Sequence, residues 1–411
     1  MVKKLILVAT ATASSFCGFA QSDDIKVKIS GYVKADYWID TRKHSEGVDG
    51  LFSYFPLAPE YDAAGTDLND VPTANLSALS TRLRLHVAGP DLFGAKANAI
   101  VETDFTGTND VALLRIRLAN LTLSWKKATL IVGQAWHPFV IPQFIPRTVG
   151  INMAAPFQPF NRNPQVTYTY KFDNGFKLLG SLNYQSSYES FGPNGKSSIY
   201  LRNALLPNLD FQVSKAFGKS TLGVAYDYKM LRPAISNVGA DGKKYKNSNT
   251  VSSSSFLAYY NYTSDKLFVL AKQIYAENMS EFLMQGGYAV SSTNPLTGVQ
   301  EYTPSKGSST LLNISYGTQY RIGGTFGYFA NGGFKDNIQK GASTYTRAVD
   351  LKQLYRIAPH FIYTNKNLML SFEAEYNRAY WGKVNYDDKG KIVDANAVNG
   401  FRFLTSLQYN F

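Results

Sequence analysis

Polar and apolar residues alternate with a period of two through much of this 411-residue chain. A period of two places successive side chains on opposite faces of a β-strand, so each such segment predicts a strand with one apolar and one polar face. The clearest examples occupy residues 31–40, 165–172, 176–185, 312–321, 372–377 and 401–411. Because many segments of this kind follow one another, the sequence predicts an all-β protein.

Two kinds of interruption separate these segments. Short turns are expected near residues 90–94, 126–127, 173–175, 218–219, 264–266, 323–324 and 365–367. Longer stretches rich in Gly, Pro, Asn and Asp lie near residues 41–74, 137–163, 189–207, 232–249, 279–308, 336–348 and 382–399, with a shorter loop near 107–111. Seven turns that alternate with eight loops predict about 16 antiparallel strands, with both chain ends on the side of the short turns.

Strands with one apolar and one polar face suit a barrel wall between lipid and a watery lumen. After the first 20 residues no apolar run approaches the ~18–20 residues of a transmembrane helix, so a helical membrane protein is excluded. Aromatic residues make up 14% of the chain, with 28 Tyr and 26 Phe, which indicates aromatic girdles at the membrane interfaces. We therefore expect a transmembrane antiparallel β-barrel with long outer loops and short periplasmic turns, wide enough to enclose an aqueous channel.

The first 20 residues have the features of an export signal: lysines, a mainly apolar stretch at 5–19 and a small-x-small cleavage site at 18–20. Cleavage would leave residues 21–411 as one outer-membrane barrel domain without Cys17, the single cysteine of the chain. Loss of the two lysines lowers the formal net charge from +12 to +10. In an exported barrel this basic balance indicates an electropositive passage for anions, and no nucleic-acid partner is expected.

Charged residues at alternate positions mark one side of the predicted lumen. They are Arg82 and Arg84 in one strand, Glu102 and Asp104 in the next, and Arg115 and Arg117 in the third. A charge facing lipid costs about 2–4 kcal/mol at the bilayer centre, so we expect all six side chains to face the lumen.

The expected turns also predict how these side chains pair. A hairpin centred on Leu92 would place Arg82 directly opposite Glu102. Tight closure near Asn109 would bring Arg117 near Glu102 and Arg115 near Asp104. Two compatible interpretations follow: a polarised lining that attracts anions, or cross-strand ion pairs that let charged side chains coexist in the wall. The surplus of arginine over carboxylate favours some anion attraction.

A proline-rich apolar segment, residues 137–147, follows the strand that ends at Trp136. Its three prolines prevent it from joining a sheet, and its apolar content disfavours full exposure. It could fold inward and narrow the pore, with His137, Phe144 and Arg147 as the candidate constriction residues and Arg147 pointing into the lumen. The alternative is a loop packed over the rim or against a neighbouring subunit.

Signals for enzymatic chemistry are weak. The four histidines, at positions 44, 86, 137 and 360, lack metal-ligand spacing, and no Gly-x-Ser-x-Gly motif occurs. The sequence therefore predicts no catalytic residue, no metal and no cofactor.

Five motifs occur in an order that resembles the DcaP-like porins of Gram-negative outer membranes. They are Gly-Tyr-Val-Lys-Ala-Asp at 31–36, Thr-Arg-Leu-Arg-Leu at 81–85, Glu-Thr-Asp-Phe at 102–105, Leu-Arg-Ile-Arg-Leu at 114–118 and Gly-Gln-Ala-Trp at 133–136. The resemblance implies a trimeric diffusion channel for small organic anions, with Arg82, Arg84, Arg115 and Arg117 at the constriction.

The chain departs from the family pattern in two places. Residues 21–28 are too few for the periplasmic coiled coil that members often carry, and Leu118 and Ala119 stand where the family tends to have His. At the other end, the terminal Phe411 resembles the signal read by the outer-membrane barrel assembly machinery.

Two hypotheses follow. The first is a non-enzymatic outer-membrane porin for small hydrophilic solutes with a bias toward organic anions, surrounded by outer-membrane lipids and assembled as a homotrimer. The second is a non-conducting barrel with a loop-borne binding or adhesin role, or a lipid-modifying enzyme. The loops at 232–249 and 279–308 are long enough to present such a surface.

Overall fold

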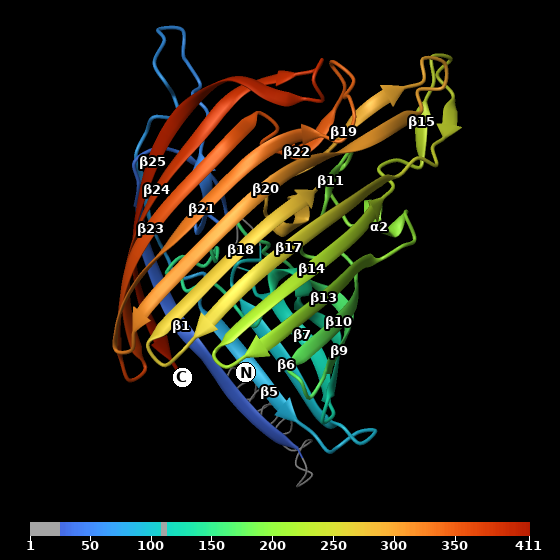
Figure 1. The fold of residues 1–411 in the computed structure, drawn as a ribbon. Coiled ribbons are helices and arrows are strands. Elements are labelled where there is room, and N and C mark those ends of the chain that lie inside the picture. Colours follow the sequence, from blue (N-terminus) through green and yellow to red (C-terminus); the bar gives the residue numbers. More distant parts are fainter. Residues whose placement is uncertain (1–24, 108–112) are drawn as a thin grey trace, which may run out of the picture.

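The protein is a single closed antiparallel β-barrel (Figure 1). The computed structural model describes residues 25–107 and 113–411, so the predicted signal peptide and most of the short loop near 107–111 lie outside the described residues. Sixteen of the described strands form the wall, and it closes because the first strand pairs with the last. The predicted all-β barrel of about 16 strands is confirmed.

The wall strands run from β1 to β25 in chain order. They are β1 (Lys26–Asp40), β5 (Arg82–Ala88), β6 (Lys96–Asp104), β7 (Arg115–Ser124), β8 (Ala128–Trp136), β9 (Arg162–Lys171), β10 (Phe176–Asn183), β13 (Asn208–Phe217), β14 (Ser220–Leu231), β17 (Val251–Thr263), β18 (Leu267–Glu277), β20 (Gln300–Gly317), β21 (Tyr320–Phe334), β23 (Leu351–Asn365), β24 (Leu368–Asn385) and β25 (Lys391–Asn410).

Shorter elements lie in the connections. They are β2 (His44–Gly47), β3 (Phe52–Pro56), β4 (Thr73–Ser77), η1 (Pro138–Val140), β11 (Phe191–Gly192), β12 (Gly195–Lys196), α2 (Ile199–Arg202), β15 (Ser236–Val238), β16 (Lys244–Lys246), η2 (Ser280–Phe282), β19 (Gly286–Thr293) and β22 (Thr344–Arg347). Among the described residues, no helix is long and apolar enough to cross a membrane.

Short turns join the strands at one end of the barrel and long loops join them at the other (Figure 1). We call these ends the short-turn rim and the loop rim. The beginning of β1 and the end of β25 meet near the short-turn rim, where the Gly31 amide donates a hydrogen bond to the Phe411 carbonyl at 3.0 Å. Both ends of the described barrel therefore lie on the side expected from an even number of strands.

One predicted turn is wrong. Gly323 and Gly324 lie inside β21, and the chain reverses earlier, between Gly317 and Tyr320. Gly317 has a φ of +112°, which favours glycine at the end of β20. Gly323 is instead needed for close packing, because a Cβ there would lie 2.4 Å from the Ile314 carbonyl oxygen.

Two predicted loops are too long. Within 382–399 the strands continue to Asn385 and resume at Lys391, so the connection is a tight turn. Within 279–308, β20 already begins at Gln300 and pairs there with β19. The polar residues in these stretches indicated loops, but strands that extend past the exposed apolar band have polar residues on both faces and need no apolar alternation.

Burial alternates along many of the wall strands, as the sequence pattern predicts. In β17, for example, the buried Leu257 and Tyr259 alternate with the exposed Phe256 and Tyr260. Exposed aromatic side chains recur beside the short turns, as expected for an interfacial girdle: Phe172, Phe176, Phe217, Tyr316, Tyr320 and Phe411.

Residues 137–161, which we call the inner loop, fold into the barrel. Their carbonyl groups accept hydrogen bonds from side chains on the lumen face of widely separated strands: Val140 from Lys272 Nζ at 2.7 Å, Phe157 from Ser309 Oγ at 2.8 Å, and Ala155 from Arg356 Nη1 at 3.0 Å. The loop therefore crosses the interior of the barrel.

The first loop, residues 41–72, packs over the inner loop. Its β2–β3 hairpin places Phe52 against Phe160, with ring centroids 5.2 Å apart, and Phe55 against Trp381 at 5.7 Å. These contacts belong to an apolar cluster that joins both loops to the wall. Such packing stabilises the irregular chain within the barrel by removing apolar surface from water.

Candidate functional site

The six charged residues predicted on one wall lie together on β5, β6 and β7. Arg82 pairs with Asp104 and Arg84 with Glu102 across the β5–β6 ladder. The expected position of Arg82 directly opposite Glu102 on the ladder is therefore wrong by two residues. The hairpin is centred on Phe93, which has a φ of +54°, and not on Leu92.

A β-bulge in β7 determines the position of Arg117. Glu102 pairs with Leu118 and the next residue, Thr103, pairs with Ile116, so Arg117 is the extra residue between them. A bulge of this kind redirects a side chain and changes the alternation of the strand. Arg117 consequently reaches both carboxylates of β6.

Glu102 accepts bonds from arginines on both neighbouring strands. Arg117 Nε donates to its Oε1 at 2.7 Å, and Arg84 donates to its Oε2 from Nε at 2.6 Å and also from Nη2. Arg82 Nε lies 3.6 Å from Oε1, and its guanidinium also lies over the Tyr32 ring at 5.1 Å. One carboxylate thus holds three guanidinium groups on one wall.

Asp104 is equally well paired. Arg115 Nη2 and Arg117 Nη1 donate to its Oδ2 at 3.0 and 2.5 Å. The Thr106 hydroxyl donates to Oδ1 at 2.8 Å. The predicted proximity of Arg115 to Asp104 and of Arg117 to Glu102 is therefore observed, with Arg117 shared between the two acids.

The exposed fractions of the side chains show which charges face the lumen. The side chains of Glu102 and Asp104 are only 1% and 2% exposed, whereas those of Arg84 and Arg115 are 36% and 21% exposed. Four arginines surround two carboxylates, and the carboxylates lie beneath them. This wall therefore presents guanidinium groups, not carboxylates, to the lumen.

A cavity of about 310 Å³ separates this wall from the inner loop. On the wall side it is lined by Tyr32, Lys34, Arg82, Arg84, Arg117 and Trp136, and on the loop side by Ile145, Pro146, residues 148–151 and Met153. The strands β23, β24 and β25, which adjoin β1, contribute Ile362, Met369, Ser371 and Gln408. The cavity therefore has a cationic wall that faces a largely apolar loop.

Lys34 and Tyr32 were not predicted as site residues, although the sequence carried a signal for them. Both lie at positions of the first strand that share a face with Asp36 and Asp40, so the alternation placed them on the polar side. Trp136, whose ring lies 6.0 Å from the Arg117 guanidinium, was expected only as the end of a strand and of the Gly-Gln-Ala-Trp motif, and not as a site residue. Their position at the cavity depends on the path of the inner loop.

The inner loop is fastened to two nearby strands of the wall, β1 and β24. On β1, Lys34 Nζ donates to the Val149 carbonyl at 3.0 Å and pairs with Asp36 at 3.0 Å. On β24, the Glu373 carboxylate accepts hydrogen bonds from the amides of Val149 and Gly150 at 3.1 and 3.0 Å. Hydrogen bonds to charged groups are stronger than neutral ones, so these contacts hold this part of the loop in place.

The three predicted loop residues lie beside the cavity lining and not in it. His137 is fully buried at the base of the loop, and Phe144 packs on Tyr259 with ring centroids 5.9 Å apart. The Arg147 guanidinium lies over the Phe268 ring at 4.4 Å. The cavity is lined instead by their neighbours in the same loop.

Comparison with known proteins identifies the fold. No family model matches the chain, and no curated protein matches its sequence. Among solved structures, the outer membrane channel DcaP of Acinetobacter baumannii matches with a TM-score of 0.65 and 17% identity, over 96% of this chain and 99% of that chain.

Two further structures match over nearly the full length. The outer-membrane OmpT of Vibrio cholerae has a TM-score of 0.55 and 12% identity, over 95% of this chain and 99% of that chain. The anion-selective porin from Comamonas acidovorans has a TM-score of 0.56 and 11% identity, over 94% of this chain and 100% of that chain. The resemblance to DcaP expected from the motifs is confirmed at the level of structure, and the chain has the fold of outer-membrane porins.

Proposed function

We propose that the protein is an outer-membrane porin, a water-filled channel through which small hydrophilic solutes diffuse, with a bias toward organic anions. The observation that carries the bias is the wall of β5, β6 and β7, where arginines are exposed to the cavity and the carboxylates are buried beneath them. Fixed positive charge at a narrow passage lowers the free energy of an anion there and raises that of a cation.

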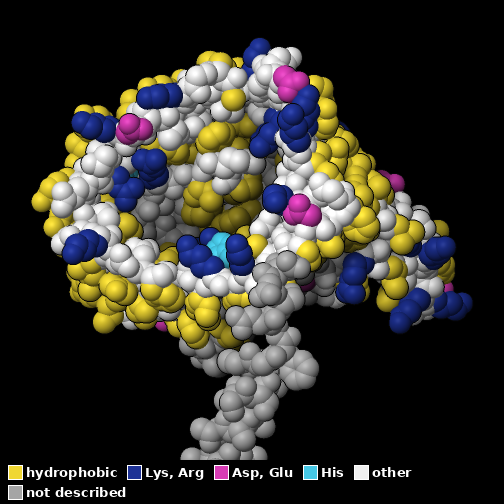
Figure 2. All heavy atoms as spheres, turned by 90° about the horizontal axis from the view of Figure 1, so that it is seen from below, with side chains coloured by type: hydrophobic (Ala, Val, Ile, Leu, Met, Phe, Trp, Pro, Cys, Tyr) yellow, Lys and Arg dark blue, Asp and Glu magenta, His cyan; other side chains and the backbone are white. Residues whose placement is uncertain are grey.

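The short-turn rim is basic as well, which supports an anion path. Figure 2, seen from below, shows a hollow at the short-turn rim with Lys and Arg side chains gathered around its edge.

Exposed lysines beside the short turns outnumber the exposed acids there. The lysines are Lys26, Lys28, Lys96, Lys126, Lys171, Lys215, Lys219, Lys266 and Lys366, and the acids are Asp91, Asp173 and Asp265. A basic mouth of this kind concentrates anions near the opening. In the proposed orientation this rim faces the periplasm and the loop rim faces outward.

The proposal includes the cellular setting. The chain is exported by its signal peptide, inserted through recognition of Phe411 by the assembly machinery, and embedded in outer-membrane lipid as a homotrimer. Support for the oligomer comes from the trimer form of Vibrio cholerae OmpT, whose fold matches over 95% of this chain with a TM-score of 0.54. No enzymatic step and no nucleic-acid partner form part of the proposal.

Single-channel recording in a planar bilayer under a KCl gradient tests it. The wild-type protein should conduct with a reversal potential that favours anions, and Arg82→Ala/Arg84→Ala should shift that potential toward zero. Lys340→Ala, which removes an exposed lysine of an outer loop, is the matched control and should leave it unchanged.

Two results would count against the proposal in different ways. Absence of conductance from correctly folded protein would contradict the porin and favour a role for the outer loops. If the double variant conducts with the same reversal potential as the wild type, the protein is a channel but Arg82 and Arg84 do not determine its anion selectivity.

A further inference from the structure

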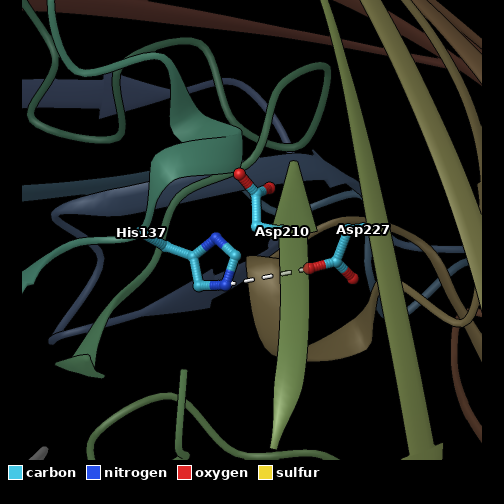
Figure 3. Close-up of side chains that lie close together, drawn as sticks. All are labelled: His137, Asp210 and Asp227. Atoms are coloured by element: carbon cyan, nitrogen blue, oxygen red, sulfur yellow. Dashed lines mark ion pairs between the residues drawn. The ribbon is translucent and has the colours of Figure 1, made fainter. Parts of the chain in front are cut away.

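A second cluster of ionisable side chains lies at the base of the inner loop, against the β13–β14 wall. His137 immediately follows β8, where the inner loop begins, and Asp210 and Asp227 are direct partners across the β13–β14 ladder. Figure 3 shows the three side chains converging, with the imidazole of His137 directed toward the acid pair. Loop and wall thus meet at three potential ligands.

The acid pair lacks a permanent cationic partner. Asp210 and Asp227 are 0% and 2% exposed, and in the described part of the chain no lysine or arginine forms an ion pair with either. The nearest lysine on the same strand, Lys229, is paired with Glu281 and also donates to the Asn278 carbonyl at 2.5 Å. Buried carboxylates without a counter-charge are costly, so this region has a deficit of positive charge.

The polar atoms that face the centre of the cluster are also unpaired. His137 Nε2, Asp210 Oδ2 and Asp227 Oδ2 are all buried without a hydrogen-bond partner among the described residues. His137 is 1% exposed, and its Nε2 lies 3.8 Å from Asp227 Oδ2. One ligand atom from each of the three residues can be chosen so that all lie within 4.8 Å of one another.

We propose that His137, Asp210 and Asp227 bind a divalent first-row transition-metal ion of the zinc class. One imidazole nitrogen and two carboxylate oxygens are ligands that such an ion accepts, and water can complete its coordination. The ion supplies the positive charge that the acid pair lacks. It also joins the base of the inner loop to β13 and β14, on the side of the barrel away from the arginine wall.

The protonation of His137 is part of the proposal. Its Nδ1 accepts a hydrogen bond from the Phe139 amide at 3.2 Å, so the free imidazole carries its proton on Nε2. Coordination through Nε2 requires that proton to move to Nδ1, and the Phe139 bond is given up. The other neighbours remain: the Phe282 ring packs edge-on against the imidazole at 4.8 Å, and Gln212 donates to Asp210 Oδ1 at 3.0 Å.

The test uses the full mature chain refolded in detergent with Zn²⁺ present, so that a buried site can fill during folding. After dialysis, elemental analysis should find about one zinc ion per chain in the wild type. His137→Gln and Asp227→Asn should each weaken binding by at least about tenfold. The control Asp241→Asn, an exposed acid of an outer loop, should bind as the wild type does.

Substitution with Co²⁺ gives a second readout, because a bound ion with imidazole and carboxylate ligands produces visible absorption that His137→Gln removes. Folded wild-type protein that retains almost no zinc would overturn the proposal, and would mean that a shared proton or water compensates the acid pair. Equal zinc retention in the wild type and both ligand variants would overturn it as well. The wild-type stoichiometry decides the matter even if a variant fails to fold, and Asp210→Asn then replaces that variant.

Discussion

Two buried carboxylate pairs in the same barrel wall have opposite surroundings. Glu102 and Asp104, on β6, are covered by four arginines from the strands on either side. Asp210 and Asp227, on β13 and β14, have only His137 as an ion-pair partner within the described residues. The first region has more positive than negative charge, and the second has the reverse.

The comparison shows how burial distributes function around one wall. In the first region the carboxylates position the arginines, and the uncompensated positive charge is directed to the passage. In the second region the inner loop covers the acids, so the imbalance cannot be relieved by bulk water. In our two proposals, a permeating anion compensates the charge of the first region and a bound cation compensates that of the second.

The largest expected effect is the loss of folding stability when Arg117, which pairs with both acids of the first region, is replaced. Arg117→Leu leaves two carboxylates with part of their pairing removed in a buried site, and should lower the free energy of unfolding by about 3–5 kcal/mol. Arg84→Leu, at a side chain that is 36% exposed, should cost only about 0–1 kcal/mol. Urea titration of the folded barrel in detergent measures both, and equal losses would contradict the distinction between buried and exposed arginines.

Removing the acids should have opposite effects in the two regions. With zinc chelated, Asp210→Asn/Asp227→Asn should raise the free energy of unfolding by about 1–3 kcal/mol, because it removes uncompensated buried charge. Glu102→Gln/Asp104→Asn should lower it, since four arginines then lose their partners. The same urea titration compares the double variants, and a change of the same sign in both would show that the two regions do not differ in charge balance.

The next largest expected effect is that of Lys34→Met on how often the inner loop is displaced. Lys34→Met removes a charged hydrogen bond to the Val149 carbonyl, worth about 1.5 kcal/mol locally. The population with a displaced loop should rise about tenfold, seen as more frequent current fluctuations in single-channel traces. Lys340→Met, in an exposed outer loop, should behave as the wild type, and equally quiet traces from Lys34→Met would show that the remaining contacts, such as those of Glu373, hold the loop alone.

The smallest expected effect is that of ionic strength on anion selectivity. The screening length falls from about 10 Å at 0.1 M salt to about 3 Å at 1 M, so the partly exposed arginines should select anions less well in concentrated KCl. Reversal potentials measured at a constant concentration ratio should move modestly toward zero as both solutions are made more concentrated. A selectivity that stays constant over this range would indicate filtering by size and not by fixed charge.

Several details of the site were beyond the reach of sequence patterns. The hairpin between β5 and β6 is centred one residue later than expected, which changes every pairing on these strands by two positions. The bulge at Arg117 has no local signature, because arginine and aliphatic residues still alternate through it. The glycine pair at 323–324 resembled a turn, but it serves close packing inside β21.

The sequence by itself determined the barrel, the two faces of the regularly alternating strands and the presence of an arginine-rich wall. These properties follow from the period of two and from the cost of charge in lipid, both of which act strand by strand. Only the tertiary structure decided the path of the inner loop, the burial of Glu102 and Asp104 beneath arginines, and the meeting of His137 with Asp210 and Asp227. The contacts of His137 join residues that are 70 or more positions apart in the sequence. No local sequence pattern indicates which distant strand a loop will contact inside a closed barrel.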